Sequence, residues 1–139
     1  MTIAIHITNR QKTLSVDRRR MRRAVQAILR DAEIAHAEIS IALVDDPTIA
    51  RLHQKFLDDP EPTDVLSFVF DRSEQSLEGE VVASADTARA YAAKHKSAPD
   101  VELLLYVIHG TLHLVGYDDT APRPRAVMRK MERKYFGTR

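Results

Sequence analysis

Two histidines that stand four residues apart, His109 and His113, are followed closely by a glycine and a pair of aspartates. On an α-helix, residues at positions i and i+4 share one face with Cβ atoms about 5 to 6 Å apart, so both imidazoles can reach one ion at a Zn–N distance of roughly 2.0 to 2.1 Å. A third ligand must come from outside the helix. Gly116 predicts a turn just past the helix end, because glycine adopts the left-handed conformation without strain. Asp118 and Asp119 follow that turn.

The stretch around the histidines is apolar on nearly every side, which predicts a helix that is buried nearly all round. Its apolar members are Leu103, Leu104, Leu105, Val107, Ile108, Leu112, Leu114 and Val115. Buried imidazoles need polar partners, so two on one face beside a carboxylate favour a shared metal ion. The alternative is a core helix whose histidines bond to backbone carbonyls.

The residue after His109 is Gly110, whereas a zinc peptidase with the H-E-x-x-H motif carries its general base at that position. Peptide hydrolysis is therefore a minor alternative. The same kind of site can serve another hydrolysis, because bound Zn²⁺ lowers the pKa of its water and polarises a phosphoryl or carbonyl oxygen.

The string H-G-T-L-H-L-V-G-Y-D-D at residues 109–119 resembles the signature H-G-x-L-H-L-x-G-Y-D-H of the YbeY family, bacterial metal-dependent endoribonucleases implicated in maturation and quality control of ribosomal RNA. The segments T-D-V-L-S-F at residues 63–68 and G-E-V-V-A-S at residues 79–84 extend this resemblance along the chain. It implies one Zn²⁺, or another divalent ion, held by His109, His113 and Asp119. We expect Asp118 to orient a ligand histidine from behind.

The chain departs from the family pattern at four positions. Asp119 replaces a histidine; a carboxylate is an acceptable ligand at about 2.0 to 2.2 Å, but it makes the ion complex less positive and should weaken the preference for zinc. Leu57 aligns with an arginine thought important for cleavage, and phosphoryl transfer relies on such cations. The catalytic residue therefore stays unassigned. His53 replaces an asparagine, and Val69 replaces a proline.

Length and composition indicate one globular domain over residues 1–139, of which 44% are hydrophobic. The sequence has no apolar run of about 18 to 20 residues and no signal-peptide layout at its amino terminus, so we expect a cytoplasmic protein without a membrane partner. It has no cysteine, which leaves His, Asp and Glu as the strong metal ligands. A net charge of +1 gives no overall attraction to nucleic acid, so RNA must be bound by local basic patches.

Hydrophobic periodicity predicts about four strands and five helices. Strands are expected over residues 3–7, 38–45, 63–70 (covered on both faces) and 79–83, with loops over 58–62 and 71–78. Helices are expected after a cap at Asp17, from residue 46, after a cap at Ser84 or Asp86, from Pro99, and after a turn flanked by Pro122 and Pro124. These elements predict an α/β or α+β domain, and the family resemblance favours a mixed four-stranded sheet packed by the helices, with the metal site at the end of a buried helix.

The helices should bury one face each. The predicted buried residues are Met21, Ala24, Val25, Ile28, Leu29 and Ala32 in the first, Ile49, Leu52 and Phe56 in the second, and Val127, Met128, Met131 and Tyr135 in the last. The charged side of the last helix, with Arg125, Arg129, Lys130, Arg133 and Lys134, is interpreted as a solvated face.

Five arginines crowd the first turns of the first predicted helix: Arg18, Arg19, Arg20, Arg22 and Arg23. The helix macrodipole disfavours cations there. A counter-anion would relieve this, so Arg18, Arg19, Arg22 and Arg23 are candidates for contacts to RNA phosphates, against a merely solvated face.

With the metal site expected from the residues, the resemblance to the YbeY family implies a metal-dependent endoribonuclease that cleaves single-stranded RNA in maturation of the 3′ end of small-subunit ribosomal RNA. Its expected partners are ribosomal RNA and the small subunit, with no DNA partner, and it is expected to be a monomer or weak oligomer. One alternative is a ribosome-associated metal-binding module whose cleavage is weak or lost because of Leu57. Another is a metal hydrolase for a different substrate.

Overall fold

The computed structural model describes residues 2–57 and 63–137, which form four strands and five helices. Their order is β1 (Thr2–Asn9), α1 (Arg18–Asp31), β2 (His36–Val44), α2 (Asp46–Leu57), β3 (Val65–Arg72), β4 (Ser76–Ser84), α3 (Ala85–His95), α4 (Pro99–Leu114) and α5 (Pro122–Phe136). The loop predicted over 58–62 lies outside the described residues. The predicted α+β class with a four-stranded mixed sheet and five helices is confirmed.

The strands form one sheet in the order β1-β2-β4-β3. β1 and β4 both run parallel to β2, and β3 runs antiparallel to β4 along the far edge. Ile5 pairs with Ile39, and Ile39 pairs with Gly79, so one register carries across the three parallel strands.

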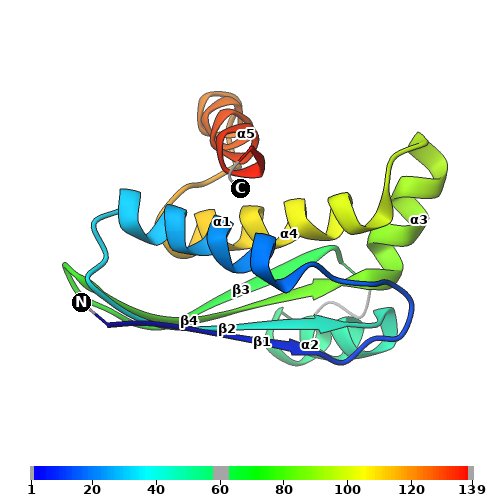
Figure 1. The fold of residues 1–139 in the computed structure, drawn as a ribbon, viewed down its shortest axis with the longest axis horizontal. Coiled ribbons are helices and arrows are strands. Elements are labelled where there is room, and N and C mark those ends of the chain that lie inside the picture. The colour runs from blue at the N-terminus through cyan, green and yellow to red at the C-terminus, as the bar shows by residue number, and fades with distance from the viewer. Residues whose placement is uncertain (1, 58–62, 138–139) are drawn as a thin grey trace.

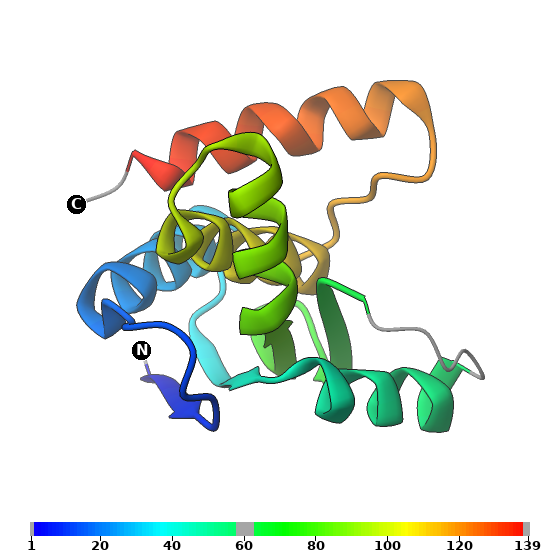
Figure 2. The same ribbon diagram turned by 90° about the vertical axis from the view of Figure 1, so that its right-hand side faces the viewer.

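The helices form layers on the two faces of the sheet (Figure 1). α1 and α4 lie over one face, and α5 lies above them as a further layer. α4 is therefore enclosed between the sheet and α5, which explains why an almost wholly apolar helix forms there. α2 packs on the other side of the sheet (Figure 2). There Ile49 joins a small second core with Val44, Leu66 and Val82.

Local signals at three helix starts are confirmed. The Asp17 side chain accepts a hydrogen bond from the Arg20 backbone N–H and caps α1. Of the two candidate caps for α3, Ser84 is the one used, since its hydroxyl accepts from the Thr87 N–H at 3.1 Å. Pro99 occupies the first turn of α4, where its missing N–H costs no helical hydrogen bond. Among the described residues, no helix has both the length and the apolar character needed to cross a membrane.

The region around β3 differs from the prediction. β3 was expected to be covered on both faces, but Val69 is 52% and Phe70 is 62% exposed on this strand, which lies at the edge of the sheet. The loop predicted over 71–78 is also wrong. β3 continues to Arg72 and β4 begins at Ser76, so a short hairpin turn takes the place of the loop.

Three predictions about helix faces and ends are also wrong. Phe56 is 55% exposed at the last turn of α2 and packs its ring against Phe68 at a centroid distance of 5.2 Å. Val127 is 46% exposed, because α5 lies on the outside and buries only a narrow stripe with Met128 and Tyr135. α5 begins at Pro122, so both Pro122 and Pro124 belong to its first turn, where proline is tolerated.

Candidate metal centre

The imidazoles of His109 and His113 lie on one face of α4 near its carboxyl end, as the four-residue spacing predicts. Their Nε2 atoms are 3.1 Å apart, and the ring planes are inclined at 77°. Both side chains are only partly exposed, at 23% and 31%. Two nitrogens thus meet at one point at the edge of the core.

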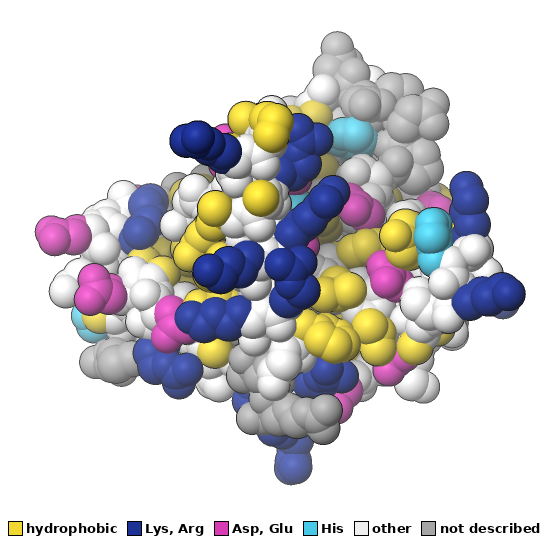
Figure 3. Space-filling view, turned by 90° about the horizontal axis from the view of Figure 1, so that it is seen from above, with side chains coloured by type: hydrophobic (Ala, Val, Ile, Leu, Met, Phe, Trp, Pro, Cys, Tyr) yellow, Lys and Arg dark blue, Asp and Glu magenta, His cyan; other side chains and the backbone are white. Residues whose placement is uncertain are grey.

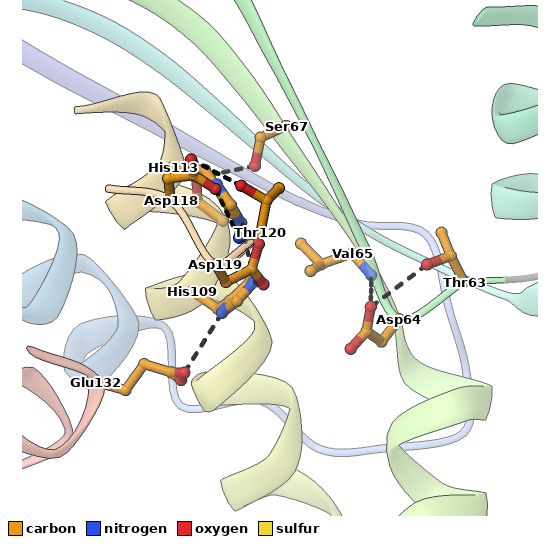
Figure 4. A network of polar contacts seen from close by, with 11 residues as sticks. Thr63, Asp64, Val65, Ser67, His109, His113, Asp118, Asp119, Thr120 and Glu132 are labelled. Atoms are coloured by element: carbon orange, nitrogen blue, oxygen red, sulfur yellow. Dashed lines mark hydrogen bonds and ion pairs between the residues drawn. The ribbon is translucent and has the colours of Figure 1, made fainter. Parts of the chain in front are cut away.

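Asp119 reaches the same point from the loop after α4 (Figure 4). Gly116 has φ of +109°, and the N–H groups of Gly116 and Tyr117 donate to the His113 and Leu112 carbonyls, so the chain turns back over the helix end. Asp119 Oδ2 lies 3.3 Å from His109 Nε2, and its Oδ1 lies 3.6 Å from His113 Nε2.

The three side chains suit a tetrahedral metal ion, since their ligand atoms all lie within 4.8 Å of one another. Ligands about 2.1 Å from a tetrahedral centre are separated by roughly 3.4 Å. The separations of 3.1, 3.3 and 3.6 Å between the two imidazoles and the carboxylate bracket that value. His109, His113 and Asp119 could therefore hold one ion.

Glu132 of α5 contacts the ligand set (His109, His113 and Asp119) on the Nδ1 side of His109. Its Oε1 lies 3.3 Å from His109 Nδ1 (Figure 4). This hydrogen bond is the main cause of the raised pKa of His109, against the opposing effect of burial. A proton held on Nδ1 leaves the Nε2 lone pair directed toward His113 and Asp119, which is the tautomer that binds a metal.

Asp118 occupies a different position from its neighbour. Its carboxylate accepts hydrogen bonds from the Thr120 N–H at 2.8 Å and the Thr120 hydroxyl at 3.0 Å, and these bonds lower its pKa. Asp118 thus fixes the loop that presents Asp119. The orienting role expected of Asp118 stays a prediction, and the histidine contact that the structure shows is made by Glu132.

Gly110 brings α4 into close contact with the sheet beside the site. A Cβ at this position would lie 2.6 Å from Val81 Cγ1 and 3.0 Å from Ser67 Oγ, and the Ser67 hydroxyl donates to the Gly110 carbonyl at 2.8 Å. The glutamate of an H-E-x-x-H peptidase has no room here. The packing therefore supports the exclusion of that peptidase arrangement.

Two hollows meet at the ligand set, and His109, Asp119 and Asp64 line both. The first, of about 410 Å³, lies between α4 and α5 and also contacts Glu132. The second, of about 560 Å³, opens along β3 and also contacts His113. The open space beside the ligand set thus reaches in two directions.

Leu57, which aligns with the family arginine, lines the second hollow with its side chain, and the residue as a whole is 56% exposed. Val69 lines the same hollow. A residue at position 57 therefore faces the space beside His109 and His113, and in this chain that residue carries no charge.

The start of α1 lies away from the ligand set, and its Arg20 lines a hollow beside the first turns of α4 with Asp100, Leu103 and Leu104. Arg18 and Arg22 donate to the Ile7 and Ile5 carbonyls of β1 at 3.4 and 3.3 Å, which binds the helix to the edge of the sheet. The RNA contact of Arg18, Arg19, Arg22 and Arg23 stays a prediction.

Two residues of the site were missed in the sequence. Glu132 lies 23 residues after His109, with no local signal that links them. Asp64 belongs to the T-D-V-L-S-F segment, which was a signal that could have identified it. The Val65 N–H and the Thr63 hydroxyl donate to its carboxylate at 2.8 and 3.4 Å, so the start of β3 fixes Asp64 where the hollows meet (Figure 4).

Comparison with known proteins gives one consistent result. The family model described as Endoribonuclease YbeY matches residues 6–138. Proteins named Endoribonuclease YbeY from Syntrophus aciditrophicus and Protochlamydia amoebophila are 37% and 33% identical, each over 98% of this chain and over 89% and 93% of their own lengths. One from Rhodopirellula baltica is 46% identical over 68% of this chain and 50% of its own. The solution structure of TM1509 from Thermotoga maritima matches 95% of this chain and 86% of its own, with a TM-score of 0.66 and 27% identity.

Proposed function

Because the chain belongs to the Endoribonuclease YbeY family, we propose that it is a metal-dependent endoribonuclease that cleaves single-stranded RNA in maturation of the 3′ end of small-subunit ribosomal RNA. The observation that carries this proposal is the convergence of His109, His113 and Asp119 on one point beside two open hollows. We place the activity in the cytoplasm, with the small ribosomal subunit as partner.

His109, His113 and Asp119 would hold the ion, which when bound lowers the pKa of water and polarises a phosphoryl oxygen. Glu132 fixes the His109 tautomer, and the Asp118–Thr120 hydrogen bonds fix the loop that presents Asp119. Ser67 and Gly110 hold the α4 turn that carries His109 against β3. The chain's contribution is thus a pre-formed set of donors on rigid elements, which is what positioning an RNA phosphate requires. We propose zinc as the ion, with weaker selectivity than three histidines would give.

The position of Leu57 favours a second candidate function. An uncharged side chain lines the hollow where a cation would stabilise the transition state. A ribosome-associated metal-binding module with weak or lost cleavage therefore remains the alternative to a competent nuclease.

Cleavage assays separate these functions. Metal-loaded protein is incubated with a structured and an unstructured RNA, beside the His113→Ala variant, and the metal content of both proteins is measured. Cleavage of the unstructured RNA by the wild type alone supports the nuclease. Equal cleavage by both proteins would indicate a contaminating nuclease. Metal binding without cleavage by the wild type would support the binding module.

A further inference from the structure

The two hollows that meet at the ligand set differ in charge. Among the described residues that line the hollow along β3, there is no lysine or arginine, and most are apolar. The hollow between α4 and α5 is lined by Arg125 and Arg129 of α5. Among the described residues, the lysine or arginine side chains on the walls of these two hollows therefore come from α5.

Arg125 and Arg129 lie on the face of α5 that looks toward the ligand set. They are separated by one helical turn and alternate with Met128 and Glu132, which also line the hollow. Met128 is 1% exposed and fixes the rotation of the helix, and Glu132 contacts His109. Arg123 and Lys130 project from the opposite face, since each residue turns the helix by about 100°.

Both arginines have guanidinium groups that are available for a ligand. Within residues 2–57 and 63–137, no ion pair or side-chain hydrogen bond involves Arg125 or Arg129. Other cations nearby are already engaged: Lys134 pairs with Asp31 at 3.5 Å, and Arg20 donates to the Phe136 carbonyl at 3.1 Å. Figure 3 shows Lys and Arg side chains gathered in a band over the face that α5 covers.

The charge balance of this hollow gives the arginines a role. Four carboxylates line it, from Asp64, Glu102, Asp119 and Glu132. A divalent ion balances two of them, and the two arginines balance the other two. Burial also raises the pKa of Glu102. Without the arginines, the wall would repel an RNA phosphate.

On the basis of the proposed RNA cleavage, we propose that Arg125 and Arg129 form a phosphate-binding pair that holds the RNA backbone beside the metal ligands. The guanidinium group presents a planar fork of N–H donors that matches phosphate oxygens in two-point contacts. The pair supplies on the α5 side the positive charge that Leu57 does not supply on the β3 side. The part of the charged side of α5 that carries Arg125 and Arg129 is thus a binding surface for RNA, and not only a solvated face.

Binding to a 2′-O-methyl RNA, which cannot be cleaved through its own 2′-hydroxyl and whose intact length is checked on a gel after each titration, tests the pair independently of catalysis. The probe is a short fluorescein-labelled single-stranded RNA with 2′-O-methyl groups, titrated with metal-loaded protein at several salt concentrations. The variants are Arg125→Gln/Arg129→Gln, the conservative Arg125→Lys/Arg129→Lys, and a matched control, Arg123→Gln/Lys130→Gln, which removes the same charge from the opposite face of α5. Metal content and melting temperature are measured for each.

The double variant Arg125→Gln/Arg129→Gln, the Gln pair, should bind RNA about tenfold or more weakly than the wild type. Its plot of log binding constant against log salt concentration should be shallower by about 1.4, the value for two lost phosphate contacts to a single strand. The double variant Arg125→Lys/Arg129→Lys, the Lys pair, should keep much of that salt dependence and lose part of the affinity. The control should bind within about twofold of the wild type, because the charges of Arg123 and Lys130 lie off the proposed RNA path. Equal losses in the Gln pair and the control would overturn the proposal, because net charge alone would explain them. Unchanged binding by the Gln pair would overturn it as well. If the wild type binds this RNA but cleaves no unmodified RNA, the proposed function fails while the arginine pair stands.

Discussion

His109 Nδ1 lies 3.3 Å from Glu132 Oε1, so the last helix of the chain orients a ligand that belongs to the buried helix α4. The contact joins two elements that the sequence separates by the loop through Asp118 and Asp119. A carboxylate behind a ligand imidazole fixes its tautomer and raises its basicity. The candidate metal centre is therefore built from α4, the loop and α5 together.

We expect Glu132→Ala to weaken metal binding by about 10- to 100-fold, because His109 loses the acceptor that holds its Nδ1 proton. Glu132→Gln should lose less, since its amide oxygen can still accept that hydrogen bond. Competition with a chelator measures the affinities. Glu74→Gln, in the exposed turn between β3 and β4, is the matched control. An affinity for Glu132→Ala equal to that of the wild type would exclude the orienting role.

Replacing Asp119 tests the third ligand. Asp119→His should keep the ion and raise the fraction of zinc over other divalent metals, because nitrogen ligands suit zinc better than hard oxygen. Asp119→Ala should lose most of the bound metal. Elemental analysis of the purified variants gives both results. If metal content and RNA cleavage stay unchanged in both variants, Asp119 is not a ligand.

Introducing a cation at position 57 should increase cleavage. Leu57 is 56% exposed and lines the hollow beside the two histidines, so the protein should tolerate Leu57→Arg. This variant should raise kcat/KM on single-stranded RNA by about 10- to 100-fold, which is less than the roughly 10³- to 10⁵-fold effect of a well-placed arginine finger. Phe70→Arg adds the same charge on β3 and is the control, since Phe70 is not among the residues that line this hollow. A rate increase shared by both variants would point to general charge attraction instead.

Gly110→Ala should destabilise the protein by about 1 to 3 kcal/mol, because its methyl group would overlap Val81 and push α4 away from the sheet. Gly137→Ala is the control: its Cβ would meet its nearest neighbours at 3.6 and 3.8 Å, and an effect within about 0.5 kcal/mol is expected. Urea unfolding measures both. Equal stability of the Gly110→Ala variant and the wild type would mean that the close contact at this helix turn is not tight in solution.

Stability should fall in acid partly through Asp31. The Tyr135 hydroxyl donates to its carboxylate at 2.8 Å and, with Lys134, lowers the pKa of Asp31 below 3.8. The folded pKa thus lies below the unfolded one, so this contribution to the free energy of unfolding is present above about pH 4 and is lost as the pH falls through the folded pKa. Asp31→Asn should flatten the pH dependence of unfolding in that window, whereas Asp71→Asn should not. A dependence that is as steep in Asp31→Asn as in the wild type would contradict this.

The convergence of His109, His113 and Asp119 was predictable because a helix and the turn that ends it are local structures. The spacing of His109 and His113 and the glycine at position 116 fix their geometry within a few residues. Glu132 was not predictable in this way, because it reaches His109 only through the packing of α5 on α4.

Errors in the predicted fold have a similar cause. Periodicity reports which residues are apolar, and it does not report which strand lies at an edge or which helix lies outermost. The exposed side chains of Val69 and Phe70 follow from the edge position of β3, and that of Val127 follows from the outer position of α5. These positions are decided by topology, which the local pattern does not contain.

The contact of Glu132 with His109 also couples occupancy of the centre to the far end of the polypeptide. Binding an ion would restrain α4, the connecting segment from Gly116 to Ala121, and α5 at once, although the chain has no disulfide to tie them. Limited proteolysis in that segment should therefore report metal loading, with chelator-treated protein nicked sooner than protein saturated with the ion.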